Sequence, residues 1–275
     1  MSSRRRYPHE IEGPDSDDRD FAAPSPGRDS ESMVVGGLNA VLAALKSRPK
    51  SGRTLMVAEG RRPAPTLSRI FDLARSAGLT VKIAPRQALD RVFGHDSHQG
   101  VVALFDARDY LGLEDFLDLI PPEGPALVLA LDQVEDPGNL GALMRSARAF
   151  GALGVLVPRD RTAPLTPAAL RASAGAAESL PLVRTVNLRR ALEGLQKMGF
   201  WLAGAEGEGG ESLFEFQFPE RTVMVLGSEG RGLSPLIKKV CDFLLTIPQH
   251  REHVSSLNVS VAGGILMSEY FRQYH

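Results

Sequence analysis

Cysteine is almost absent from this chain of 275 residues, which contains only Cys241. One thiol cannot form an internal disulfide, nor can it supply the several thiolates of a zinc or iron–sulfur site. His250 and His253 share one loop without an evident third ligand, so they do not indicate a metal site either. We therefore expect a protein of a reducing compartment, the cytoplasm, that binds no metal.

Long apolar runs are also missing. No segment approaches the roughly 20 apolar residues that span a bilayer, and the N-terminus lacks the apolar core of a signal peptide. The start is basic, from Arg4 to Arg6, but six acidic residues follow by Asp20. Transit peptides are poor in acidic residues, so the sequence predicts neither a membrane partner nor a transit peptide.

Strong charge of either sign is lacking, because the formal net charge is −1. Residues 1–32 hold five arginines and eight acidic residues, a net charge of −3, which leaves +2 for the rest of the chain. A mildly basic body is compatible with a nucleic-acid partner but does not require one.

The length suggests about two domains of roughly 150 residues. Residues 1–32 are rich in Pro, Ser and charged residues, which predicts a disordered tail. Residues 33–107 predict a small α/β domain, residues 108–123 a linker with two prolines, and residues 124–275 a second domain. The helices expected in the small domain are 34–45 and 66–76, and its strands are 54–58, 79–83 and 101–105.

In the second domain, short apolar runs recur with helical segments between them. These runs are 126–131, 153–157, 182–183, 200–203, 222–226 and 243–247. Buried strands that alternate with helices predict a mainly parallel sheet covered on both faces. Ligands of such sheets bind beyond the carboxyl ends of the strands, so the loops that follow strands are the candidates for chemistry.

The first such loop contains a turn at residues 136–139 and leads into a helix that is expected to run from Asn139, as N-cap, to Phe150. A capped strand–helix unit accounts for all of this except Arg145. With Asn139, Arg145 would lie in the first turns of a helix whose backbone amides favour anions. An RNA phosphate or ribose is a plausible target for this pair.

The second loop carries Glu229 among three glycines, with Ser234 and Pro235 at the start of the next helix. Glycines let a ligand approach the backbone closely, although a solvated turn is the alternative. Their order is G-x-x-G-x-G rather than the dinucleotide-binding G-x-G-x-x-G, and the chain has no G-x-x-x-x-G-K-[ST]. A nicotinamide-dependent reductase and a P-loop protein are therefore disfavoured.

The third stretch spans residues 247–262 and includes the start of a helix that is expected to continue to about Gln273. Ser255 or Ser256 can cap this helix, which would place Asn258 in its first turn.

Three motifs in this order, D-P-x-N-x-G-A-x-x-R-S-A, G-S-E-G-x-G-L and I-P…S-S-L-N-V-S-V-A, resemble the signatures of the SpoU (TrmH) branch of the SPOUT methyltransferases. The resemblance covers about residues 124–275, and residues 171–178 are also similar to that family. It implies an α/β fold with a trefoil-knotted sheet, bound S-adenosylmethionine, methyl transfer to an RNA ribose 2′-hydroxyl, and a homodimer with sites at the interface. Residues 33–107 resemble the L30e-like RNA-binding domain of many members.

The same resemblance implies roles for particular residues. The catalytic set is Asn139, Arg145, Glu229, Ser256 and Asn258. The cofactor-binding set is Leu226, Gly227, Ile247, Pro248, Ser256 and Leu257. Residues 249–253 depart from the usual shorter segment. A guanidinium is effectively always protonated, so Arg145 is expected to clamp a phosphate, and Glu229 to orient Arg145 or receive the proton.

Over both domains the chain is most similar to the bacterial members that methylate a guanosine of 23S rRNA, and next to mitochondrial large-subunit rRNA relatives. Two alternatives stay open. One is a tRNA 2′-O-methyltransferase, because the motifs report the chemistry rather than the substrate. The other is a non-catalytic RNA-binding or ribosome-assembly protein of the same fold, which the intact catalytic set disfavours.

Overall fold

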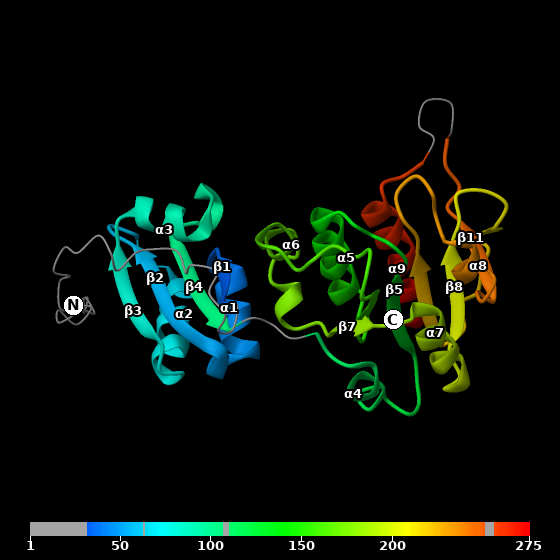
Figure 1. Ribbon diagram of the computed structural model, residues 1–275, viewed down its shortest axis with the longest axis horizontal. Coiled ribbons are helices and arrows are strands. Elements are labelled where there is room, and N and C mark those ends of the chain that lie inside the picture. The colour runs from blue at the N-terminus through cyan, green and yellow to red at the C-terminus, as the bar shows by residue number, and fades with distance from the viewer. Residues whose placement is uncertain (1–31, 63, 107–109, 251–255) are drawn as a thin grey trace, which may run out of the picture.

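The computed structural model describes residues 32–62, 64–106, 110–250 and 256–275. They form two units that lie side by side, one around a four-stranded sheet and one around a seven-stranded sheet (Figure 1). The predicted disordered tail lies outside the described residues except for Ser32, which begins a strand.

The N-terminal unit is a small sheet with helices on both faces. Its elements are β1 (Ser32–Gly36), α1 (Leu38–Ser47), β2 (Gly52–Ala58), α2 (Pro65–Ser76), β3 (Thr80–Ala84), α3 (Arg86–Phe93) and β4 (Val101–Asp106). The strand order is β1-β4-β2-β3, with β2 and β3 parallel and the other pairs antiparallel. Along β2, Leu55 and Val57 pack with α1 and α2, whereas Met56 and Ala58 pack with α3.

The start of the helix expected over residues 34–45 was placed four residues too early. Val34 and Val35 belong to β1 and pair with β4, and the helix begins only at Leu38. Gly37 separates the two elements with a φ of 96°, in the region that favours glycine. The β-branched valines then extend the sheet, as their preference for strands predicts.

The second unit is built on parallel strands that match the predicted apolar runs. Its elements are α4 (Leu113–Leu117), β5 (Ala126–Leu131), α5 (Pro137–Ala149), β6 (Val155–Pro158), α6 (Pro167–Ala172), β7 (Leu182–Thr185), α7 (Leu188–Lys197), β8 (Trp201–Ala205), β9 (Glu211–Ser212), β10 (Arg221–Leu226), α8 (Pro235–Lys238), β11 (Phe243–Thr246) and α9 (Val259–Tyr274). The strand order is β7-β6-β5-β10-β8-β11-β9, and each neighbouring pair is parallel.

Helices cover both faces of this sheet, as predicted. Along β5, Leu127, Leu129 and Leu131 pack with α5 and α9, whereas Val128 and Ala130 pack with α4, α7 and α8. Because a strand directs successive side chains to opposite faces, the unbroken apolar run of β5 supplies two cores.

The segment predicted to be a linker, residues 108–123, contains helix α4. Phe116 is fully buried in the core beneath α7, and the backbone of Leu111 donates to the Leu182 carbonyl oxygen at 3.0 Å. The described part of residues 108–123 therefore belongs to the second unit. Prolines and charges suggested a linker, whereas burial of the apolar side chains between them decided the structure.

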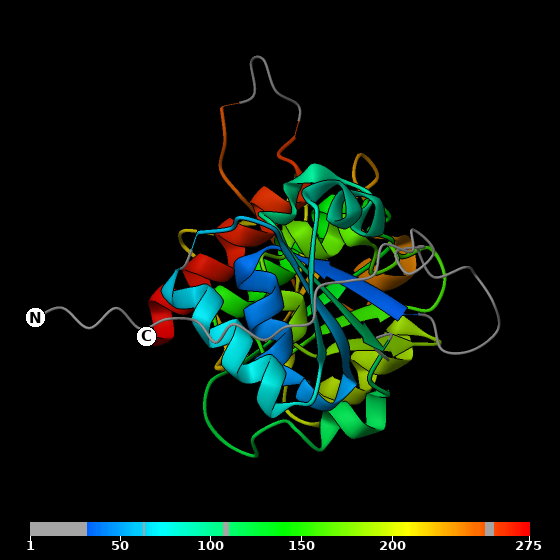
Figure 2. The same ribbon diagram turned by 90° about the vertical axis from the view of Figure 1, so that its left-hand side faces the viewer.

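The two units meet through α1 and the short helical turn Ala176–Glu178. Figure 2 views the molecule from the side of the N-terminal unit, with the second unit behind it. Arg48 Nε donates to Glu178 Oε2 at 2.8 Å, and Arg48 Nη1 donates to the Asp106 carbonyl oxygen at 2.7 Å. The Glu178 side chain is only 1% exposed. Arg171 lies over the Phe93 ring, with 5.5 Å between the guanidinium carbon and the ring centroid.

We predict that Arg48→Met lowers the free energy of unfolding by about 3 kcal/mol, because it leaves the buried Glu178 carboxylate without its ion-pair partner. The matched control is Arg53→Met, which breaks the exposed pair with Asp106 in the same unit and should cost less than about 1 kcal/mol. Urea unfolding of both variants makes the comparison. Equal effects of the two substitutions would contradict the importance of the contact between the units.

Candidate active site

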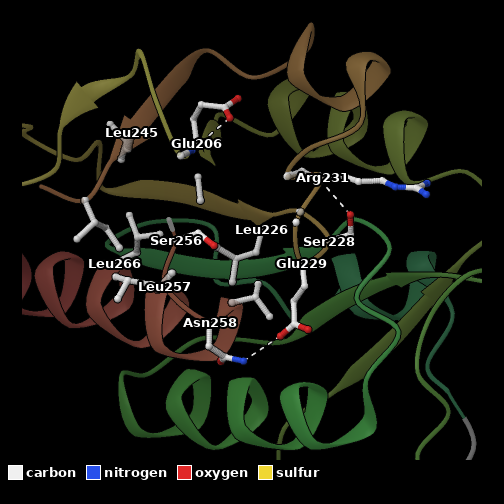
Figure 3. A pocket seen from close by; sticks show the side chains of 18 of the residues that line it. Glu206, Leu226, Ser228, Glu229, Arg231, Leu245, Ser256, Leu257, Asn258 and Leu266 are labelled. Atoms are coloured by element: carbon white, nitrogen blue, oxygen red, sulfur yellow. Dashed lines mark hydrogen bonds between the residues drawn. The ribbon is translucent and has the colours of Figure 1, made fainter. Parts of the chain in front are cut away.

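A cavity of about 420 Å³ opens at the carboxyl ends of β8, β10 and β11. Figure 3 shows it between the loop that follows β10 and the start of α9. Seven of the predicted site residues line it: Leu226, Gly227, Glu229, Ile247, Ser256, Leu257 and Asn258. Three do not, namely Asn139, Arg145 and Pro248.

A second cavity, of about 500 Å³, lies against the start of α5. Gln133, Asp136 and Asn139 line it, together with Glu229 and Arg231 from the loop after β10. Glu229, Ser228 and Arg231 line both cavities. Glu229 therefore stands where the two spaces meet.

Asn258 is the N-cap of α9, whereas the sequence placed it in the first turn with Ser255 or Ser256 as the cap. Ser255 lies outside the described residues, and Ser256 lies two positions before the cap. The Asn258 Oδ1 atom accepts from the backbone N–H of Ser260 at 2.9 Å and from the Ser260 hydroxyl at 2.6 Å. With the carbonyl oxygen so engaged, the amide group Nδ2 must point away from the helix.

Nδ2 of Asn258 donates to Glu229 Oε1 at 2.8 Å and to Asn139 Oδ1 at 3.0 Å (Figure 3 draws the former). Asn139 in turn donates through its own Nδ2 to the same Glu229 oxygen at 2.5 Å. One carboxylate oxygen thus receives two amide donors from the starts of two different helices, α5 and α9. We call Asn139, Glu229 and Asn258 the amide–carboxylate network.

Asn139 was expected to cap α5, but Asp136 does so. Oδ1 of Asp136 accepts from the backbone N–H of Asn139 at 2.7 Å, and Pro137 occupies the first helical position. Both Asp and Asn are good N-caps, and Pro favours the position that follows the cap. Because the cap is made by Asp136, the Asn139 side chain is available to the network.

The loop that carries Glu229 is closed by its glycines. The backbones of Ser228 and Gly232 exchange two hydrogen bonds of 3.0 Å each. A Cβ atom on Gly227 would lie 2.0 Å from the Gly232 carbonyl carbon, so no side chain fits there. The loop is tied to the neighbouring strand as well, because buried Asp132 accepts from the Ser234 backbone N–H at 2.7 Å.

Arg145 lies in the third turn of α5 and is exposed. Among the described residues, Glu229 forms hydrogen bonds with Asn139 and Asn258 and none with Arg145. The expected contact from Glu229 to Arg145 within one chain is therefore not formed here. Arg145 is next in sequence to Ser146, which lines a shallow groove between α5 and α9.

Several lining residues were missed from the sequence. They include Glu206, Ser228, Arg231, Leu245, Ala262 and Leu266. Glu206 directly follows β8, so the rule that ligands bind beyond the carboxyl ends of strands would have found it. The described residues contain no cluster of three or more His, Cys, Asp or Glu side chains that could hold a metal ion.

Cys241 is not a candidate nucleophile. Burial, with the nearby carboxylates of Asp242 and Asp132 as lesser causes, raises the pKa of its thiol to about 12. The thiol is thus protonated at neutral pH and is a poor nucleophile.

Comparison with known proteins decides the family. The SpoU rRNA Methylase family matches residues 126–268. The chain is also 42% identical, over 247 residues, to the 23S rRNA (guanosine-2'-O-)-methyltransferase RlmB of Pseudomonas syringae pv. tomato, which covers 89% of this chain and 97% of that protein. The chain belongs to the SpoU rRNA methylase family. A second family, RNA 2'-O ribose methyltransferase substrate binding, matches residues 34–111.

Other SpoU methylases share both units. RlmB of Escherichia coli K12 is 39% identical over 242 residues, which are 88% of this chain and 99% of that protein. The AdoMet-bound rRNA methyltransferase of Sinorhizobium meliloti has a TM-score of 0.73 at 26% identity, covering 89% of this chain and 88% of that one. For AviRb of Streptomyces viridochromogenes in complex with AdoMet, the TM-score is 0.72 at 27% identity, with coverage of 88% and 90%.

We predict that Asn258→Asp separates the two roles of Asn258. Aspartate retains an oxygen for the cap, so the melting temperature should stay within about 3 °C of the parent. It also replaces the donor that faces Glu229 with a second carboxylate, and we expect methyl transfer to fall at least about tenfold. Thermal unfolding and a methylation assay make the two measurements.

Ser260→Ala is the control for that substitution, because it removes a partner of the Asn258 cap oxygen and leaves the donor to Glu229 in place. Its methylation rate should stay close to the parent rate. Full activity of Asn258→Asp would contradict the role of the network.

Proposed function

We propose that this chain is an S-adenosylmethionine-dependent RNA ribose 2′-O-methyltransferase that methylates a guanosine of 23S rRNA. The observation that carries the proposal is the amide–carboxylate network at the junction of two cavities, because methyl transfer needs a cofactor and a hydroxyl that meet at one point. The relatives named RlmB extend over both units of the chain, which favours rRNA over tRNA and an enzyme over a binding protein.

The first cavity suits S-adenosylmethionine by size and by chemistry. Small-molecule sites usually occupy about 300–1,000 Å³ and combine apolar walls with a few polar groups. Leu226, Leu245 and Leu266 form an apolar wall, and the absence of a Cβ at Gly232 leaves backbone open to a ligand on the side where Glu206 lies. The predicted Ile247, Pro248, Ser256 and Leu257 would complete the binding loop. When bound, the cofactor supplies an activated methyl group on a sulfonium.

The second cavity would receive the target nucleoside. Asn139 and Asn258 hold Glu229 through Oε1, whereas Oε2 has no hydrogen-bond partner among the described residues. Oε2 is therefore the atom that can accept the hydrogen of the ribose 2′-hydroxyl. A 2′-hydroxyl that is held in the correct orientation reacts faster, because the loss of orientational entropy has already occurred on binding.

Arg145 would act across a homodimer interface. It does not line the cavities of its own chain, and it adjoins the groove between α5 and α9. Apolar side chains at this groove are unusually exposed, 60% for Phe214 and 49% for Val261. Exposed apolar patches of this kind mark protein–protein contacts. Two copies paired there would bring Arg145 of one copy toward the other, where it would clamp an RNA phosphate.

The remaining expectations fit the same proposal. The match of residues 34–111 to a substrate-binding family supports the division into an L30e-like RNA-binding domain and a methyltransferase domain. In the sheet, β10 lies between β5 and β8, and the C-terminal helix α9 packs with α5. This arrangement is compatible with a trefoil-knotted chain. No helix among the described residues is long and apolar enough to cross a membrane. Modification of rRNA fits a cytoplasmic enzyme.

We predict that Arg145→Ala abolishes turnover and leaves the affinity for S-adenosylmethionine within about twofold of the parent value, because the substitution removes only the phosphate clamp. Mixed dimers with one Arg145→Ala copy and one Asn258→Ala copy should recover about half of the parent activity, since one of the two shared sites is then intact. Differently tagged copies allow the mixed species to be purified. Loss of cofactor affinity in Arg145→Ala, or inactive mixed dimers, would contradict this assignment.

Labelled S-adenosylmethionine offered with unmethylated 23S rRNA, 16S rRNA and tRNA tests the proposed function directly. We expect label at a single guanosine 2′-oxygen of 23S rRNA. Label in tRNA would retain the chemistry and overturn the substrate. Cofactor binding without label in any RNA, including assembled ribosomal particles, would overturn the enzymatic function.

A further inference from the structure

Glu206 places a second carboxylate in the first cavity and lies outside the three sequence motifs. It directly follows β8, which lies between β10 and β11 in the sheet. Its backbone N–H donates to the Leu245 carbonyl oxygen at 2.9 Å, so the neighbouring strand β11 fixes its position. The Glu206 side chain is 19% exposed and lines the cavity.

The Glu206 carboxylate is held in place. Oε2 pairs with Nζ of Lys238 in α8 at 2.5 Å, and Oε1 accepts from the backbone N–H of Gly207 at 3.2 Å. Each carboxylate oxygen can accept about two hydrogen bonds, so both retain capacity for another donor. A Cβ on Gly232 would lie 3.7 Å from Oε1, and the natural glycine leaves that approach open.

Glu206 and the amide–carboxylate network lie at opposite ends of the cavity. Figure 3 shows Glu206 on one side of Leu226 and the pair Glu229–Asn258 on the other. The second cavity is lined by Glu229, so the methyl-bearing sulfonium of a bound cofactor would lie at that end. Glu206 would then face a part of the cofactor that does not react.

We infer that Glu206 accepts hydrogen bonds from the ribose hydroxyls of S-adenosylmethionine; this rests on the proposed function. A carboxylate matches a pair of neighbouring hydroxyls, and dinucleotide-binding proteins use the same chemistry at the end of a strand. Because Lys238 already balances the charge of Glu206, the site suits neutral hydroxyl donors rather than the ammonium group of the cofactor. The adenine can pack against the apolar wall that includes Leu245. Lys238 is then a positioning residue.

Calorimetric binding of S-adenosylhomocysteine tests this inference without RNA or turnover. Glu206→Ala should weaken binding about tenfold to a hundredfold, as expected for the loss of hydrogen bonds to a charged group. Glu206→Gln should retain part of the affinity, because its amide oxygen still accepts. Glu208→Gln is the control: Glu208 lies in the same loop, is exposed and does not line the cavity, so the affinity should stay within about twofold.

An analogue without the ribose hydroxyls identifies the part of the cofactor that Glu206 contacts. The parent protein should bind it much more weakly than S-adenosylhomocysteine, and Glu206→Ala should bind the two alike. Lys238→Ala should lower the affinity for S-adenosylhomocysteine and reduce the preference, because Lys238 acts through Glu206, and it should leave the affinity for the analogue close to the parent value. Thermal unfolding checks that each variant is folded.

Two results would overturn the assignment. One is a Glu206→Ala protein that keeps the parental preference for the ribose hydroxyls. The other concerns a second analogue, S-adenosylhomocysteine without its amino group. If Glu206→Ala loses only the parental preference for S-adenosylhomocysteine over this analogue, Glu206 contacts the ammonium group and not the ribose. A parent protein that binds no S-adenosylhomocysteine at all would instead refute the proposed function, and this inference with it.

Discussion

The site depends on one carboxylate oxygen that receives two amide donors. Glu229 Oε1 accepts from Asn139, which is 90 residues away in the chain, and from Asn258, which is 29 residues away. Each bond joins a different loop to the turn after β10, so the loops cannot move independently without breaking it. The parallel order of β5 and β10 brings these loops to one edge of the sheet. Ser228, Glu229 and Arg231 of that turn line both cavities, and the network holds Glu229 in this shared wall.

Helix capping and site chemistry are coupled in the same residues. The side-chain carbonyl oxygen of Asn258 caps the start of α9, and this directs its Nδ2 group toward Glu229. At α5, Asp136 makes the cap and so releases Asn139 for the network. The glycine turn after β10 is locked by its own backbone and by buried Asp132. The active-site geometry is thus built mostly from ordinary helix and turn requirements.

The sheet and the motif loops could be predicted from sequence, because apolar runs and strand–loop–helix patterns are local signals. Seven of the predicted site residues do line the cavity. Two predictions failed because the outcome depended on tertiary contacts: which of Asp136 and Asn139 caps α5, and the linker that instead buries Phe116. The Arg48–Glu178 pair between the units was not predicted, for the same reason. The predicted contact of Arg145 with Glu229 was not found, since helix geometry leaves Arg145 exposed on α5.

The position of the sulfur atom in a crystal structure with S-adenosylhomocysteine tests the central claim most directly. The sulfur should lie at the end of the cavity formed by Glu229 and Asn258, facing the second cavity beside Asn139, with the ribose at the opposite end near Glu206. A sulfur atom beside Glu206, or a ligand bound outside this cavity, would contradict the account.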